Sequence, residues 1–407
     1  MKILMVNKFH YLKGGSEKYY FDLANLLKEN GHEVAFFSMK DERNIKTDCK
    51  EYFVEPIDLN TGSKLKAFDV IYSKDNKKKM EEALDDFKPD IVHLNNFQRQ
   101  LSVSIIEPIK KRNIPIVFTA HDVQAICPAI TMMDNDKNIC ERCIGGKYSN
   151  CIKKKCNKGS TLKSVIGAIE GKYYRNKKIY TEKIDKIISP SEFYKSKFIE
   201  DGVQAEKVVA MHNFVDIEQY DVELQDDGYA LYIGRLSKEK GILNLINAFA
   251  KLDSGKLYIA GEGPEKDNIE KFIKENNLEQ RVELLGFLSK EEVIDWTRKC
   301  RFTVVPSIWY ENCPYSVMET LAIGKPVVGA NIAGIPELVK DNRSGFIYKY
   351  DDINDLADKM RILFEDRNLA EEFGKNAKMD AKELYAKDVY YKKIMDIYEN
   401  LIEGKRN

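Results

Sequence analysis

Residues 229–260 read YALYIGRLSKEKGILNLINAFAKLDSGKLYIA, and this stretch decides the fold class. Residues 229–233 and 256–260 are short apolar runs typical of buried strands, and residues 242–252 between them read as a helix. A strand, a helix and a second strand in this order are typical of a parallel sheet covered by helices. The stretch therefore predicts an α/β fold.

The same alternation fills both halves of the chain, which are separated by a linker around residues 213–228. In the first half we expect a helix over residues 17–29 and strands over residues 3–6, 33–38, 91–94, 116–119 and 186–189. In the second half we expect helices over residues 265–275, 290–299 and 314–323, and strands over residues 282–285, 302–306 and 326–330. The sequence predicts two Rossmann-like doubly wound domains, residues 1–213 and 214–385, which face each other across a cleft. A last helix within residues 386–407 is expected to pack back across both domains.

Length and composition agree with two globular domains. The chain has 407 residues, of which 43% are hydrophobic and 32% are charged. The apolar run at residues 1–7 ends at Lys8, which is too short for a signal peptide, and no run approaches the roughly 20 residues that span a bilayer. We therefore expect a cytoplasmic protein that attaches at most to the inner face of the cell membrane.

A net charge of zero conceals an asymmetry between the halves. Residues 1–214 hold 37 Lys and Arg against 29 Asp and Glu, and much of the excess lies in residues 153–178, where Glu170 is the only acid. This basic segment is either a solvated helix face or a patch that meets anionic lipid headgroups. In the second case Ile166, Ile169, Tyr173 and Tyr174 would assist. We expect no nucleic-acid partner, because no nucleic-acid-binding module accompanies the patch.

Two glutamates, Glu311 and Glu319, flank the start of the predicted helix 314–323, with Pro314 suited to its first turn. The free N–H groups and partial positive charge of such a helix end favour a phosphate. The carboxylates beside it accept hydrogen bonds from sugar hydroxyls. The alternative is that Glu311 only caps the helix and Glu319 is solvated.

A second motif, GRLSKEKG at residues 234–241, lies between a strand and a helix. Its Arg235 and Lys240 can both point at one site, where two cations would stabilise a leaving diphosphate. Alternatively, they pair with acids on the surface. A third motif, Gly14-Gly15 before the first helix, lets backbone amides approach a phosphate or sugar closely, although it is weak evidence alone.

These motifs, in this order, resemble the retaining glycosyltransferases of the GT-B-fold family 4. The resemblance covers nearly the whole chain. It is carried by the residues Gly14-Gly15-Ser16-Glu17, Pro89-Asp90-Ile91-Val92-His93, Thr119-Ala120-His121-Asp122, Pro190-Ser191-Glu192, Gly234-Arg235-Leu236, Lys240-Gly241, Gly261-Glu262-Gly263-Pro264, Glu311 and Glu319. Residues 312–315, Asn-Cys-Pro-Tyr, depart from the family's glycine-rich stretch, so the contacts to the sugar are not carried over.

The resemblance implies a role for each matching residue. Arg235 and Lys240 would hold the donor diphosphate, helped by amides near Gly14 and Gly15. Glu319 would bind the ribose and Glu311 the transferred sugar. On the same basis, His121 lines the sugar site unless it is a core residue. Donor contacts are also expected from Gly286, Phe287 and Tyr315.

The resemblance further implies retaining, metal-independent transfer of a hexose-type sugar from a nucleotide-diphosphate sugar. The acceptor would be a saccharide or a polyprenyl-linked saccharide in cell-surface polysaccharide or glycolipid biosynthesis. Rival functions are a sugar-nucleotide epimerase or sugar-phosphate synthase of the same fold, and a non-catalytic sugar or nucleotide binder.

Five of the eight cysteines fall within an insertion at about residues 124–178. Four of them, Cys140, Cys143, Cys151 and Cys156, have the spacing C-x2-C-x7-C-x4-C, which favours a structural zinc site in a cytosolic protein. Cys127 is an alternative ligand, an iron–sulfur cluster is a second possibility, and reduced free thiols are the third. No cofactor is expected for catalysis.

Overall fold

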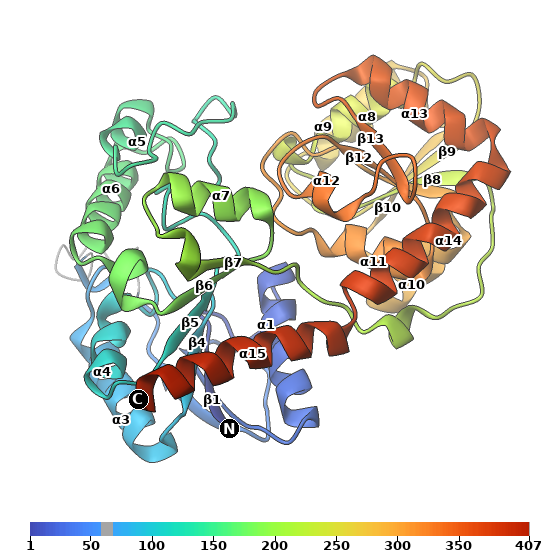
Figure 1. The fold of residues 1–407 in the computed structure, drawn as a ribbon. Helices are drawn as coiled ribbons and strands as arrows, with labels where there is room; N and C mark the ends of the chain where they lie inside the picture. The colour runs from blue at the N-terminus through green and yellow to red at the C-terminus, as the bar shows by residue number, and fades with distance from the viewer. Residues whose placement is uncertain (58–67, 407) are drawn as a thin grey trace. The chain divides into compact units, whose positions relative to one another are not determined.

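The computed structural model describes residues 1–57 and 68–406, which form two compact units. The first unit comprises Met1–His212 together with the chain from Tyr390 onward, and the second comprises Asn213–Val389. Each unit is a parallel sheet with helices around it (Figure 1). The prediction of an α/β protein with two Rossmann-like domains is confirmed.

The sheet of the first unit has seven strands in the order β3-β2-β1-β4-β5-β6-β7, and all neighbours are parallel. The strands are β1 (Lys2–Val6), β2 (Glu33–Met39), β3 (Lys50–Val54), β4 (Ile91–Leu94), β5 (Ile116–Thr119), β6 (Lys186–Ser189) and β7 (Val208–Ala210). The central strands are continuous buried apolar runs, because helices cover both faces of such a sheet.

The helices of the first unit are α1 (Gly15–Glu29), α3 (Lys74–Phe87), α4 (Ile106–Lys111), α5 (Ser149–Lys154), α6 (Thr161–Asn176), α7 (Glu192–Glu200) and α15 (Lys387–Arg406). Serines cap three of them: Ser73, Ser160 and Ser191 each accept a hydrogen bond from a backbone N–H in the first turn. Within Pro190-Ser191-Glu192, Ser191 is thus the N-cap of α7 and Glu192 its first residue.

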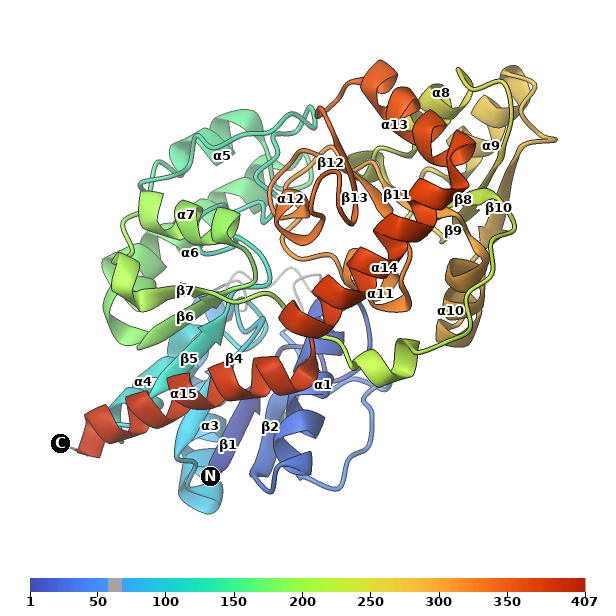
Figure 2. The ribbon, with the colours of Figure 1, turned by 45° about the vertical axis from the view of Figure 1, so that its right-hand side comes forward.

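Helix α15 returns to the first unit from the far end of the chain and lies beside α1 (Figures 1 and 2). The hydroxyl of Tyr390 lies 2.5 Å from that of Tyr19. The hydroxyl of Tyr398 lies 2.5 Å from Nδ1 of His93, whose Nε2 is 2.7 Å from Oγ1 of Thr119. The last helix thus completes the buried polar contacts of β4, β5 and α1.

The sheet of the second unit has six parallel strands in the order β10-β9-β8-β11-β12-β13. The strands are β8 (Tyr229–Ile233), β9 (Lys256–Ala260), β10 (Val282–Gly286), β11 (Phe302–Val305), β12 (Val327–Ala330) and β13 (Gly345–Tyr348). The helices are α8 (Ile242–Phe249), α9 (Lys266–Glu275), α10 (Lys290–Lys299), α11 (Tyr315–Ile323), α12 (Ile335–Leu338), α13 (Ile353–Glu365) and α14 (Arg367–Leu384).

In each sheet the order in which strands are added reverses once, between β1 and β4 in the first unit and between β8 and β11 in the second. Parallel sheets of this kind bind ligands beyond the carboxyl ends of the two strands at which the order reverses. The fold therefore directs attention to the loops after β1, β4, β8 and β11. Within the described residues, no helix is long and apolar enough to cross a membrane.

Candidate functional site

The motifs of the second unit meet where its strand order reverses. The loop after β8 carries Arg235 and Lys240, and the loop after β11 carries Glu311 and leads into α11. Helix α11 begins after Pro314, and no side chain caps its first turn. The loops that the sequence singled out are thus neighbours, beside a helix N-terminus whose N–H groups point out of the helix.

Glu311 is the centre of this group. It is buried, and its Oε1 accepts three hydrogen bonds: from Nζ of Lys240 at 2.6 Å, from Oγ of Ser307 at 2.7 Å and from Nε1 of Trp309 at 2.8 Å. Burial alone would raise the pKa of Glu311, but the charge of Lys240 and the three hydrogen bonds outweigh it and hold the pKa below its usual value. Glu311 is therefore a carboxylate at neutral pH.

Lys240 reaches Glu311 because of the glycine that follows it. Gly241 has a φ of +69°, and a Cβ placed there would lie 1.9 Å from the carbonyl oxygen of Pro306. The backbone N–H of Ile308 donates to the carbonyl of Glu239 at 2.9 Å, which joins the same two loops. Only glycine combines this φ with so close an approach, so the turn fixes Lys240 next to the loop after β11.

The remaining predicted donor residues lie around the same edge of the sheet. Arg235 is exposed and forms no ion pair with any described residue. Glu319, on α11, accepts a hydrogen bond from the hydroxyl of Tyr220 at 2.9 Å. Tyr315 is the first residue of α11. Gly286 ends β10 with a φ of +71°, and Phe287 beyond it is 80% exposed.

The first unit places His121 beyond the end of β5. Its Nε2 lies 2.9 Å from Oδ1 of Asn95, which follows β4, and its ring packs edge-on at 4.8 Å from that of Tyr19. Burial, together with the nearby charge of Lys8, lowers the pKa of His121 to about 3. His121 is therefore a neutral hydrogen-bonding group at physiological pH.

Gly14 and Gly15 open α1 at the same edge of the first sheet. Gly14 is extended at φ −174°, and neither glycine adopts the left-handed conformation. A Cβ at Gly14 would have room, since the nearest atom, Oε2 of Glu17, lies 3.8 Å away. The backbone therefore does not demand glycine here, and close approach of a ligand remains the reason the sequence suggested.

The cysteines of the insertion gather in one region but as free thiols. Cys143 and Cys151 share a small apolar cluster with Tyr148 and Ala168, and Cys156 packs against it. Burial raises the pKa of the Cys143 and Cys151 thiols to about 12. Among residues 1–57 and 68–406, no three His, Cys, Asp or Glu side chains are arranged to hold a metal ion. The zinc site stays a prediction.

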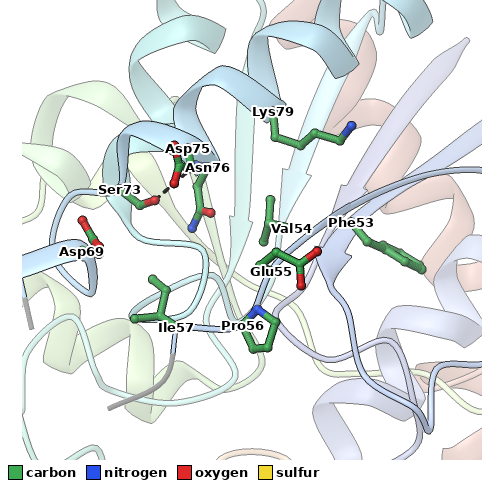
Figure 3. Close-up of a pocket in the computed structure, with 10 residues that line it drawn as sticks. All are labelled: Phe53, Val54, Glu55, Pro56, Ile57, Asp69, Ser73, Asp75, Asn76 and Lys79. Carbon is green, nitrogen blue, oxygen red and sulfur yellow. Dashed lines mark hydrogen bonds between the residues drawn. The ribbon is translucent and has the colours of Figure 1, made fainter. Parts of the chain in front are cut away.

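A separate hollow of about 410 Å³ opens at the carboxyl end of β3, beside the start of α3 (Figure 3). Its lining residues are Phe53, Val54, Glu55, Pro56, Ile57, Asp69, Ser73, Asp75, Asn76 and Lys79. None of the residues predicted from the sequence lines it.

Comparison with known proteins identifies the family. The model of Glycosyltransferase Family 4 matches residues 13–219, and the model of glycosyl transferases group 1 matches residues 216–380. The chain belongs to glycosyltransferase family 4. The predicted membership and enzyme class are thereby confirmed.

Individual relatives of this glycosyltransferase are distant. An uncharacterized glycosyltransferase of Methanocaldococcus jannaschii is 32% identical over 55% of this chain, and the match spans 62% of that protein. An uncharacterized 42.6 kDa protein in the cps region of Klebsiella pneumoniae is 28% identical over 88% of this chain and 91% of its own. Anabaena HepE, solved in complex with UDP, has a similar fold, with a TM-score of 0.71 at 17% identity over 98% of this chain and 100% of its own.

Four residues around the glycosyltransferase motifs were not singled out from the sequence: Asn95, Tyr220, Ser307 and Trp309. Ser307 and Trp309 lie four and two residues before Glu311 in the same loop. A polar or indole side chain so close to a candidate carboxylate was a usable signal. Tyr220 carried none, because its contact joins residues 99 positions apart.

Proposed function

We propose that this glycosyltransferase moves a hexose-type sugar from a nucleotide-diphosphate sugar to a saccharide or polyprenyl-linked acceptor, with retention of anomeric configuration and without a catalytic metal. The observation that carries the proposal is the ionised Glu311 beside Lys240, next to the open N-terminus of α11. Lys240 and Arg235 would bind a diphosphate at that helix end, and Glu311 would contact the sugar attached to it.

The reaction that suits these groups is a front-side displacement. The bond between the anomeric carbon and the phosphate oxygen breaks, the acceptor oxygen bonds to that carbon from the same face, and the acceptor's proton passes to the departing phosphate. Arg235 and Lys240 would stabilise the negative charge of the leaving diphosphate, as a divalent cation does in other transferases. Lys240 would turn from Glu311 to the phosphate when the donor binds.

The names of two relatives support this class of acceptor. A Staphylococcus aureus relative, 30% identical over 48% of this chain, is a poly(ribitol-phosphate) α-N-acetylglucosaminyltransferase. A Campylobacter jejuni relative, 32% identical over 44% of this chain, transfers N-acetylgalactosamine to an undecaprenol-linked diphospho-saccharide. Both names describe transfer of an N-acetylhexosamine, to a polymer in one case and to a lipid-linked saccharide in the other. We propose that this chain acts in cell-surface polysaccharide or glycolipid biosynthesis.

A thermal-shift screen of the purified protein against UDP, GDP, ADP and CMP and their common sugar conjugates tests the donor site. One nucleotide should raise the melting temperature above the others, because a ligand of the folded state stabilises it by mass action. Replacing Glu311 by Ala should leave that nucleotide shift in place and abolish transfer from the matching nucleotide sugar. No shift with any nucleotide at millimolar concentration, or undiminished turnover by Glu311→Ala, would contradict the proposal.

We further propose that α5 and α6 attach the first unit to an anionic membrane surface, where a polyprenyl-linked acceptor resides. Six lysines of the basic segment form no ion pair with any described residue: Lys153, Lys155, Lys158, Lys163, Lys172 and Lys177. Its one acid, Glu170, is buried and bound to Arg99, so it offsets none of their charge. On α6 the side chains of Leu162 and Ile169 are 70% and 49% exposed. Tyr174 is buried at 2% and is removed from the predicted patch.

Sedimentation with vesicles tests this attachment. The protein should bind vesicles that contain phosphatidylglycerol and not those of phosphatidylcholine alone. Each lysine near the surface should contribute about 1 kcal/mol to the binding free energy. Lys172→Glu with Lys177→Glu should weaken binding by roughly tenfold or more. Lys375→Glu on α14 of the second unit is the matched control. Equal binding by the unaltered protein, the double variant and Lys375→Glu would contradict the attachment through α6.

A further inference from the structure

We propose that Trp309 is a positioning residue of the transfer step, whose indole N–H fixes the Glu311 carboxylate so that its second oxygen, Oε2, is presented to the transferred sugar. The inference rests on the proposed function, which brings the sugar to Glu311. It adds a residue that neither the motifs nor the family resemblance singled out.

The hydrogen bonds of Glu311 are divided unevenly between its two oxygens. All three donors, Lys240, Ser307 and Trp309, bond to Oε1, and no described residue donates to Oε2. The Glu311 side chain as a whole is 8% exposed. The carboxylate is thus held by one oxygen and open at the other.

The two neutral donors differ from Lys240 in what they can do during the reaction. The ammonium of Lys240 sits on a flexible stem and is attracted to phosphate, so it would leave Oε1 when the donor diphosphate arrives. Ser307 and Trp309 carry no charge that a phosphate attracts, and both belong to the loop that holds Glu311. After Lys240 turns away, these two hydrogen bonds remain to orient the carboxylate.

Trp309 also contacts Lys240 directly. The ammonium lies 5.2 Å from the centre of the indole ring, within the range of a cation–π contact, while the N–H at the ring's edge binds Glu311. One side chain therefore contacts both members of the ion pair. A phenylalanine at this position keeps a ring for Lys240 but has no N–H for Glu311, so the two contributions are separable by mutation.

The test compares Trp309→Phe with Trp296→Phe, using the nucleotide sugar that the thermal-shift screen selects from UDP-glucose, UDP-N-acetylglucosamine and GDP-mannose. Trp296 is the chain's other tryptophan; it packs against Tyr229 and Tyr258 in the same unit. Trp309→Phe should lower kcat roughly 10- to 100-fold, the range expected for one hydrogen bond to a charged group. KM for the donor should change less than threefold, because the diphosphate contacts remain.

A pH profile separates positioning from a merely structural role. Loss of the N–H donor should raise the pKa of Glu311, since it removes one of the bonds that stabilise the carboxylate. The acidic limb of kcat should therefore move to higher pH in Trp309→Phe and stay in place in Trp296→Phe. Ser307→Ala should move it in the same direction, which keeps the test open if Trp309→Phe folds poorly.

Each outcome decides between the two proposals. Equal kcat and equal acidic limbs for Trp309→Phe, Trp296→Phe and the unaltered protein would overturn the positioning role, while a dead Glu311→Gln variant would leave the proposed function standing. A fully active Glu311→Gln variant would overturn the proposed role of Glu311 itself. A loss of kcat in Trp309→Phe without any shift of the acidic limb would also overturn the inference.

Discussion

Replacing Lys240 by Ala should destabilise the second unit, because it leaves the buried Glu311 carboxylate without its cation. Removing one partner of a buried ion pair costs about 3–5 kcal/mol. The side chain of Lys240 is 23% exposed and that of Glu311 8%, so water relieves part of this cost, and Ser307 and Trp309 still donate. We expect a loss of about 2–3 kcal/mol, which for a unit of this size lowers the melting temperature by roughly 4–12 °C.

A double-mutant cycle measures the pair itself. Glu311→Gln alone should cost about 1 kcal/mol, since Lys240 can turn to solvent while the amide oxygen still accepts from Ser307 and Trp309. Lys240→Ala combined with Glu311→Gln should be more stable than the sum of the single changes by about 2 kcal/mol, because no unpaired buried charge is left.

The assay is urea unfolding at pH 7.5, followed by the fluorescence of the two tryptophans, both of which lie in the second unit. Repeating it at pH 4 provides a second check. The pKa of Glu311 is held low in the folded state, so its contribution is present above the unfolded pKa and is lost as the pH falls through the folded value. Single changes that add within about 0.5 kcal/mol would refute the coupling between Lys240 and Glu311.

Three further predictions concern the glycine turn, the histidines and the cysteines. Gly241→Ala should destabilise the second unit by more than the roughly 1–2 kcal/mol that left-handed strain alone costs, because its Cβ would meet the carbonyl of Pro306. The control is Gly145→Ala in the first unit, where φ is +76° and no atom lies within 4 Å, so only that strain should lower the stability. Equal losses of stability in urea unfolding would contradict the contact with Pro306. The first unit should lose stability as the pH falls from 6.5 towards 4, because burial lowers the pKa of His10 to about 4 and of His93 and His121 to about 3, so the unfolded state takes up protons first. The upper bound of this loss is roughly 2 kcal/mol per histidine at pH 5. The second unit has no histidine, and an equal loss of its stability with acid would contradict the prediction. Elemental analysis of protein purified without added metal should find about one zinc per chain if the four cysteines bind it, and zinc well below that with no iron would count against the site.

The sequence predicted the central strands almost to the residue, and the strands it missed share one property. β3, β7 and β13 are the outermost strands of their sheets. An outer strand is covered on fewer sides, so its sequence need not be a continuous apolar run: β3 reads KEYFV and has two exposed residues. Apolar runs identify strands that are buried on both faces, and β3 does not present one. β7, VVA, and β13, GFIY, are apolar but only three and four residues long, and the prediction passed over them.

The candidate site was predicted as a set of residues but not as a set of contacts. Lys240 and Glu311 were each assigned to the donor, yet their ion pair joins residues 71 positions apart and exists because β8 and β11 are neighbours. Adjacency of strands that do not follow each other in the chain is a property of topology, which local patterns do not contain. The cysteine spacing suggests four converging thiolates, and that zinc site stays a prediction; in the described residues Cys143 and Cys151 lie in one apolar cluster, with Cys156 packed against it.

The course of the chain through its two units has a consequence for biosynthesis. Residues 1–212 leave the ribosome first, but Tyr19 and His93 do not meet Tyr390 and Tyr398 until the last helix has been translated. The second unit, continuous in sequence, has all its residues available earlier and folds as a unit of its own. The half of the enzyme that is synthesised first is therefore completed last. In a nascent chain stalled before Tyr390, Nδ1 of His93 lacks its hydrogen bond to Tyr398. A tag fused to the C-terminus is attached to the first unit, although the C-terminal residues follow the second unit in the sequence.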